Sequence, residues 1–141
     1  MNEPVAGFRL TGIELLDFKL NYPENPLPKK RSYDFKIHIK QQIDKDNKLV
    51  RVNPSVDVVM VDGEAQTNQA SIKVSCVFEL EEILSFTSDE TGEVELPERL
   101  VTSLNSIAIS TTRGVLFSEL KGTFLHGIYL PVVDTSKFAR K

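Results

Sequence analysis

The chain of 141 residues is poor in the residues that build disulfides, metal centres and membrane spans. Its one cysteine, Cys76, cannot form an intramolecular disulfide and cannot by itself nucleate a zinc site. The two histidines, His38 and His126, lie outside any HxH, HExxH or CxxC pattern. No apolar run approaches the roughly 20 residues that a membrane span requires, and the first residues lack the basic start and apolar core of a signal peptide. We therefore expect one cytoplasmic domain over residues 1–141, with no cofactor, no metal and no insertion into a membrane.

Charge and motifs exclude further classes of function. The formal net charge is −3, and so mild a charge argues against a nucleic-acid partner. The sequence has no glycine-rich phosphate loop and no nucleophile elbow. The carboxylates of the acidic segment 85–95 lack the spacing of a calcium loop. The sequence therefore predicts that the protein is not an enzyme.

Alternating apolar residues predict four strands, at 8–22, 33–43, 52–61 and 70–80. In the first, Ile13 and Leu15 break the alternation, so we expect its middle to be covered on both faces. Pro54, near the start of the third, indicates an edge strand or a bulge.

The connections between these strands differ in kind. The segment 23–32 holds three prolines in six residues, which predicts a stiff connection that crosses over the sheet. The polar run 62–69 predicts a turn.

The segment 97–131 is the most informative part of the chain. It predicts a helix with Pro97 in its first turn that runs to Arg113 and Gly114. At about 100° per residue, one face is apolar and another carries Ser103, Ser106 and Ser110, small residues that let a second helix approach closely. Strands followed by a helix predict an α+β fold, in which a four-stranded antiparallel sheet carries a long helix and a short C-terminal helix or loop on one face.

The loop after this helix, 114–130, has more apolar residues than a loop needs. These residues are Phe117, Leu120, Phe124, Leu125, Ile128, Tyr129 and Leu130. Two interpretations stay open: a lid that closes the core beneath it, or an exposed groove that binds apolar segments of partners.

The order of these elements, with the segments 8–13, 17–18, 22–23, 83–85, 105–107 and 112–114, resembles the SecB export-chaperone family over nearly the whole chain. The resemblance implies a single SecB-like domain that assembles into a dimer of dimers, so we expect a homodimer or homotetramer. It also implies that long helices meet between dimers, which would place Ser103, Ser106 and Ser110 in that interface.

The resemblance further implies an ATP-independent holdase chaperone that binds apolar segments of non-native client proteins. The residues implied to line the client grooves are Tyr22, Leu27, Tyr33, Phe35, Phe117, Leu120, Phe124 and Leu125. Asp17 fits one acidic position through which export members bind the SecA motor, but Asn21 and Val77 stand where further acids are expected. This departure makes a dedicated client, such as an antitoxin, an alternative to general export.

Two other functions are compatible with the residues alone. One is a small-molecule-binding α+β domain with a pocket between sheet and helix, for which His126 and Tyr129 are the nearby polar groups. The other is a purely structural oligomerisation module whose apolar loop is a subunit interface.

Overall fold

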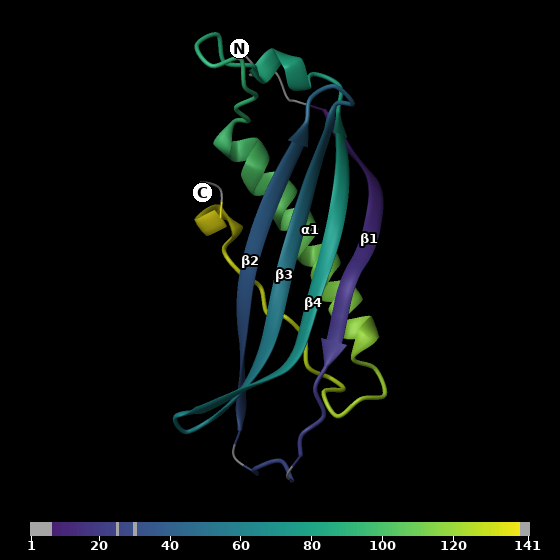
Figure 1. Cartoon of the computed structure of the whole chain (residues 1–141), viewed down its shortest axis with the longest axis vertical. Coiled ribbons are helices and arrows are strands. Elements are labelled where there is room, and N and C mark those ends of the chain that lie inside the picture. The colour runs from purple at the N-terminus through teal and green to yellow at the C-terminus, as the bar shows by residue number, and fades with distance from the viewer. Residues whose placement is uncertain (1–6, 25, 30, 139–141) are drawn as a thin grey trace.

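The computed structural model describes residues 7–24, 26–29 and 31–138. They form two layers, a sheet of four antiparallel strands and a long helix that crosses one of its faces (Figure 1). The elements in chain order are β1 (Phe8–Leu20), β2 (Ser32–Asp44), β3 (Leu49–Asp62), β4 (Ala65–Leu80), the 3-10 turn η1 (Ile83–Phe86), α1 (Glu98–Glu119) and the 3-10 turn η2 (Thr135–Phe138). The predicted α+β class and the four-stranded sheet are confirmed. Within the described residues, no helix combines the length and the apolarity that crossing a bilayer would take.

The connection between β1 and β2 is a crossover, as its prolines predict. The strand order is β1-β4-β3-β2, so these two strands lie at opposite edges of the sheet. The crossover begins at Asn21, which is fixed to β4 twice. Its backbone N–H donates to the carbonyl of Gln69 at 2.9 Å, and its side-chain amide donates to the carbonyl of Asn68 at 3.1 Å.

Two bulges in β1 explain why its apolar pattern is irregular. The pairing with β4 slips at Thr11 and again at Leu16, and each slip reverses which residues point to the helix. Ile13 and Leu15 therefore stand opposite core residues of β4 and face the helix side. Within one chain, the middle of β1 is not covered on both faces as expected, because these two side chains are 50% and 46% exposed.

Pro54 lies in a central strand, so the expected edge or bulge at this position is wrong. The residue is buried, and its pairing with Ile39 of β2 is in register. The paired positions between β3 and β4, in contrast, skip Asn53 and Pro54 without a shift in register. Because proline has no N–H to donate, the sheet loses a hydrogen bond here but keeps its alignment.

The polar run 62–69 is mostly strand and not the predicted turn. Asp62 stands opposite Ala65, so only Gly63 and Glu64 form the connection. Gly63 has φ +62°, the left-handed conformation that such two-residue hairpins require. The polar residues that follow pair with the end of β3, and the resulting ribbon projects beyond the rest of the sheet (Figure 1).

The helix α1 is longer than its sequence suggests. Pro97 occupies the N-cap, and the helix continues through Gly114, where the sequence predicts its end, to Glu119. Glycine in a helix interior costs about 1 kcal/mol relative to alanine. The fully buried side chain of Leu116, beyond the glycine, offsets this cost because it packs in the core between helix and sheet.

The space between sheet and helix is filled mainly by aliphatic side chains. Those on the strands include Val50, Val52, Val56, Val58, Ile72, Val74, Phe78 and Leu80, and those on α1 include Leu100, Leu104, Ala108, Ile109 and Leu116. A side-chain hydrogen bond also crosses this layer, from the Gln41 amide nitrogen of β2 to the Asn105 side-chain oxygen at 2.9 Å. The contact ties α1 to the edge strand β2.

Candidate functional site

The crossover and the loop after α1 meet at one end of the sheet. The rings of Tyr22 and Phe124 have centroids 5.5 Å apart and planes inclined by 46°. Tyr22 is 69% exposed, and Phe124 is half-buried. The contact brings together two residues, 102 positions apart in the chain, that the resemblance places in the same groove.

Four other predicted client-binding residues are accessible in the same part of the fold. Leu27, Tyr33 and Phe35 are half-buried, and Tyr33 and Phe35 pack against the core. Phe117 is 40% exposed, and the Lys121 ammonium lies 5.9 Å from its ring centroid. We call the accessible set the aromatic end surface, which consists of Tyr22, Leu27, Tyr33, Phe35, Phe117 and Phe124.

Arg31 fixes the far end of the crossover to this surface. Its Nε donates to the Tyr33 hydroxyl at 3.0 Å, and its Nη1 donates to the carbonyl of Pro28 at 2.8 Å. The crossover is therefore held at both ends, by Arg31 at one and by Asn21 at the other, which positions the residues between them.

Leu120 and Leu125 do not belong to an accessible surface. Both are fully buried, as is Leu130, and all three are part of the hydrophobic core. The Thr123 hydroxyl shapes the loop between the first two by donating to the Leu120 carbonyl at 2.6 Å and accepting from the Leu125 N–H at 3.1 Å. The interpretation of Leu120 and Leu125 as groove-lining residues is corrected for this conformation: they attach a lid to the core, and the accessible aromatic residues lie around it.

The turns of this lid depend on glycine. Gly122 and Gly127 have φ of +77° and +87°, which side chains other than glycine rarely adopt. These turns let three leucines at spacings of five residues return to the core.

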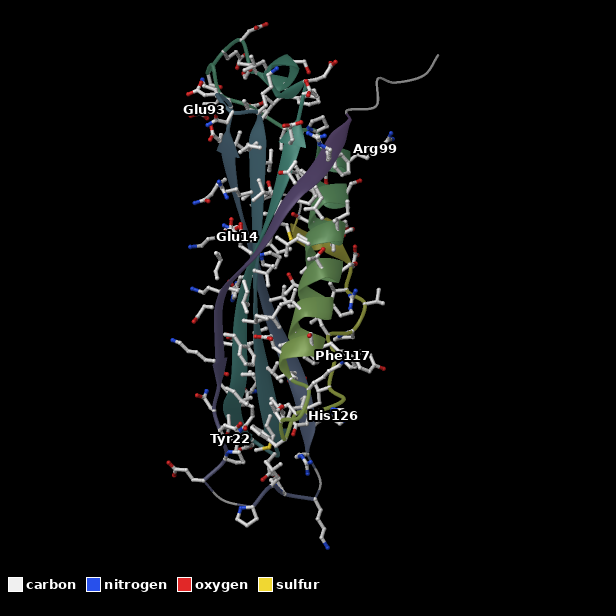
Figure 2. All side chains as sticks on the ribbon, turned by 90° about the vertical axis from the view of Figure 1, so that its right-hand side faces the viewer. Glu14, Tyr22, Glu93, Arg99, Phe117 and His126 are labelled. Atoms are coloured by element: carbon white, nitrogen blue, oxygen red, sulfur yellow. The ribbon has the colours of Figure 1, made fainter. Side chains whose placement is uncertain are left out.

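In Figure 2, Phe117 and His126 lie on the helix side of the molecule, whereas Glu14 points to the other side of the sheet.

A second apolar surface lies along β1, and sequence reasoning missed it. Four side chains of this strand are 38% to 51% exposed, and we call them the β1 apolar edge: Leu10, Ile13, Leu15 and Leu16. The signal in the sequence was the broken alternation at Ile13 and Leu15. It reflected bulges that leave an apolar edge strand uncovered within one chain.

Asp17, the candidate for contact with the motor, stands opposite a lysine. It pairs with Lys73 of β4 on the face of the sheet that α1 does not cover. Val77, at a position expected to be acidic, is 8% exposed on the same face. A lysine thus stands beside Asp17 and Val77 supplies no acid, so this face is less acidic than the resemblance implies.

Of the three serines expected between subunits, Ser106 has a partner within the chain. Its hydroxyl lies 2.6 Å from the Thr135 hydroxyl of the C-terminal segment. Ser110 accepts a hydrogen bond from Arg113 Nη1 at 3.4 Å. All three serines, Ser103 included, are exposed on α1.

Cys76 lies in the core, where its thiol is protected from reagents. Burial raises the pKa of the Cys76 thiol, and a hydrogen bond with the Thr111 side chain opposes this effect weakly.

His38 and His126 are exposed, and the described part of the chain contains no group of three or more acidic, histidine or cysteine side chains arranged to hold a metal.

We predict that native Cys76 resists iodoacetamide at neutral pH and reacts rapidly once the protein is unfolded. The folded state favours the neutral Cys76 thiol, because its pKa is raised there. The contribution of this thiol to the free energy of unfolding is therefore complete below the ordinary thiol pKa, and it is lost as pH rises through the pKa of the folded state. Urea unfolding from pH 7 to 10 should therefore show an alkaline loss of stability that is smaller in Cys76→Ala. Equal losses in both proteins would contradict this assignment.

No protein-family model and no curated protein sequence matches this chain. Among solved structures, it is similar to a SecB-like chaperone of Mycobacterium tuberculosis, determined in complex with a ChAD peptide from an antitoxin. The two are 14% identical, the alignment covers 89% of this chain and 90% of that one, and the TM-score is 0.63. This chain has a SecB-like fold. A protein of unknown function from Streptococcus agalactiae also aligns, with 17% identity, 92% and 100% coverage and a TM-score of 0.33.

The SecB-like fold accounts for the arrangement of the aromatic end surface. Its crossover spans the sheet from edge to edge and meets the loop after α1 at the Tyr22 and Phe124 rings. Residues from four parts of the sequence thereby come to one end of the molecule: the crossover, β2, the end of α1 and the loop after it.

Proposed function

We propose that this protein is an ATP-independent holdase chaperone that binds apolar segments of non-native proteins. The observation that carries the proposal is the aromatic end surface, where two exposed rings, Tyr22 and Phe117, and three half-buried ones lie beside a lid that is itself anchored in the core. Soluble monomers rarely leave contiguous apolar surface exposed unless it binds a partner. The SecB-like fold, seen in a chaperone that holds an antitoxin peptide, supports the same function.

The binding energy would come from burial of client side chains against these rings. Apolar burial contributes roughly 25 cal/mol per Å², so one short contact gives only weak affinity. Several such surfaces in one assembly would bind a long unfolded chain tightly through a high effective concentration. Binding of this kind needs no nucleotide hydrolysis.

A dedicated client fits this chain better than general export. Docking to the SecA motor would need an acidic outer face, and here Asp17 faces Lys73 while Val77 replaces an expected acid. A chaperone for one client, such as an antitoxin, does not need that patch.

The direct test is suppression of aggregation. The protein should reduce light scattering by a chemically unfolded client on dilution, without nucleotide and at about one assembly per client chain. ATP should not change the result. If scattering is undiminished at a large excess of this protein, the holdase proposal is wrong.

We propose that the protein assembles into a homodimer or homotetramer in which a second copy covers the β1 apolar edge. An exposed apolar edge strand is an aggregation hazard unless it is paired or covered. The exposed face of α1, with Ser103 and Ser110, is the second candidate interface.

Charge placed on the β1 apolar edge should break this assembly. Ile13→Asp would bury a carboxylate in the interface, so we expect a lower mass by sedimentation or light scattering. Ile43→Asp is the matched control, because Ile43 is 41% exposed on the opposite edge strand, β2. An unchanged mass for Ile13→Asp, or an equal loss in both variants, would remove β1 from the interface.

A further inference from the structure

The C-terminal segment runs back along α1 in an irregular conformation (Figure 1). Leu130 is anchored in the core, residues 131–134 have no regular secondary structure, and η2 contacts the helix. We call residues 130–135 the strap. It follows the flank of α1 that carries Ser106, Ser110 and Arg113.

The helix holds the strap largely through its main chain. Arg113 Nε donates to the carbonyl of Leu130 at 2.7 Å, and Nη2 donates to the carbonyl of Pro131 at 3.0 Å. Ser110 accepts from the third guanidinium nitrogen and helps to orient it. Every residue has a carbonyl, so this forked recognition fits an extended segment of many sequences.

Leu130 and Thr135, at the two ends of the strap, are buried, whereas the side chains of residues 131–133 add little to this hold. Pro131 is exposed, Val132 is 91% exposed and Val133 is half-buried. At the end of the strap, the Thr135 hydroxyl lies 2.6 Å from the Ser106 hydroxyl of α1. Between the buried anchors Leu130 and Thr135, the strap is held mainly by backbone contacts and one half-buried valine, so this part can be exchanged for another segment at modest cost.

We propose that the strap occupies a track on α1 that also accepts an extended, uncharged aliphatic segment of a client, so that strap and client compete. The proposal rests on the proposed holdase function. Arg113 would bind two successive carbonyls of the client as it binds those of Leu130 and Pro131. The strap would keep the track covered when no client is present.

The test measures the affinity of the full chain for a dye-labelled peptide with the sequence of residues 128–133, which is uncharged and lacks the Thr135 hydroxyl. Thr135→Val and Ser106→Ala each remove the hydroxyl contact that holds the end of the strap. Since one hydrogen bond contributes about 0.5–1.5 kcal/mol, each variant should bind the peptide about 2- to 10-fold more tightly. Ser103→Ala is the matched control, because this exposed serine lies on the same helix one turn earlier.

Arg113→Met separates a shared track from a simple cover. If Arg113 binds the peptide carbonyls as it binds those of the strap, its loss weakens both contacts, and the affinity should stay within about twofold of the wild type. If Arg113 holds only the strap, the peptide should bind more tightly. Circular dichroism and urea unfolding establish that each variant is folded. Unchanged affinity in Thr135→Val and Ser106→Ala, or tighter binding in Arg113→Met, would overturn the proposal.

A second readout uses the absence of tryptophan from the chain. The indole introduced by Val132→Trp reports on the strap, and its fluorescence anisotropy should fall when the peptide displaces it. Anisotropy that stays constant at saturating peptide would overturn the proposal. A permanently unfolded, alkylated protein distinguishes the two levels of failure: if it binds while the strap tests fail, only the strap is wrong, and if it does not bind, the holdase function is wrong.

Discussion

Replacement of Leu125 by alanine is expected to lower the free energy of unfolding by about 2–5 kcal/mol. The side chain is fully buried in the core although it belongs to a loop. Its truncation would leave a cavity beneath the lid and would loosen the loop that carries Phe124. Urea unfolding followed by circular dichroism measures the effect.

The matched control is Leu84→Ala. Leu84 is 58% exposed in η1, so its truncation should change the free energy of unfolding by less than about 0.5 kcal/mol. If Leu125→Ala costs no more than this control, the loop does not close the core, and its leucines are available to bind clients after all.

The double substitution Tyr22→Ser with Phe117→Ser is expected to weaken client binding by about 10- to 100-fold. Aromatic side chains provide much of the binding energy of protein interfaces, and truncation of a central one costs about 2 kcal/mol or more. Both rings are exposed in the free chain, so their loss should change stability little. Fluorescence anisotropy with a labelled, permanently unfolded protein measures the affinity.

Leu84→Ser controls for a general loss of apolar surface. Leu84 is as exposed as these rings but belongs to η1, at the end of the molecule away from the lid (Figure 1). It should bind the client like the wild type. Equal weakening in the control, or full affinity in the double variant, would show that clients bind elsewhere.

Much of the fold could be predicted because local patterns and tertiary structure agree. The alternation in β2 matches its burial, and the prolines after β1 match a connection that must reach the opposite edge. The apolar pattern gave wrong predictions where a single residue changed which side chains of a strand face the core, or suggested a false end to a helix. Bulges at Thr11 and Leu16 reversed the faces of β1, and Gly114 did not end the helix because Leu116 packs beyond it.

The candidate site was predicted less completely, for a related reason. Composition shows that a loop is apolar but not which of its side chains return to the core. Leu120 and Leu125 do so because Gly122 and Gly127 turn the chain, whereas Phe117 stays on the helix surface. The contacts of Arg113 with two backbone carbonyls could not be predicted from the sequence, because every residue has a carbonyl acceptor.

The sheet order also has a consequence for how the protein is made. Phe8 pairs with Leu80, whereas β2, β3 and β4 pair with their neighbours along the chain. During synthesis, β1 leaves the ribosome first and must wait unpaired until β4 has followed, and pairings so distant along the chain form slowly. The nascent chain therefore carries its own exposed apolar strand until β4 has been made, and an already folded copy would be well suited to shield it.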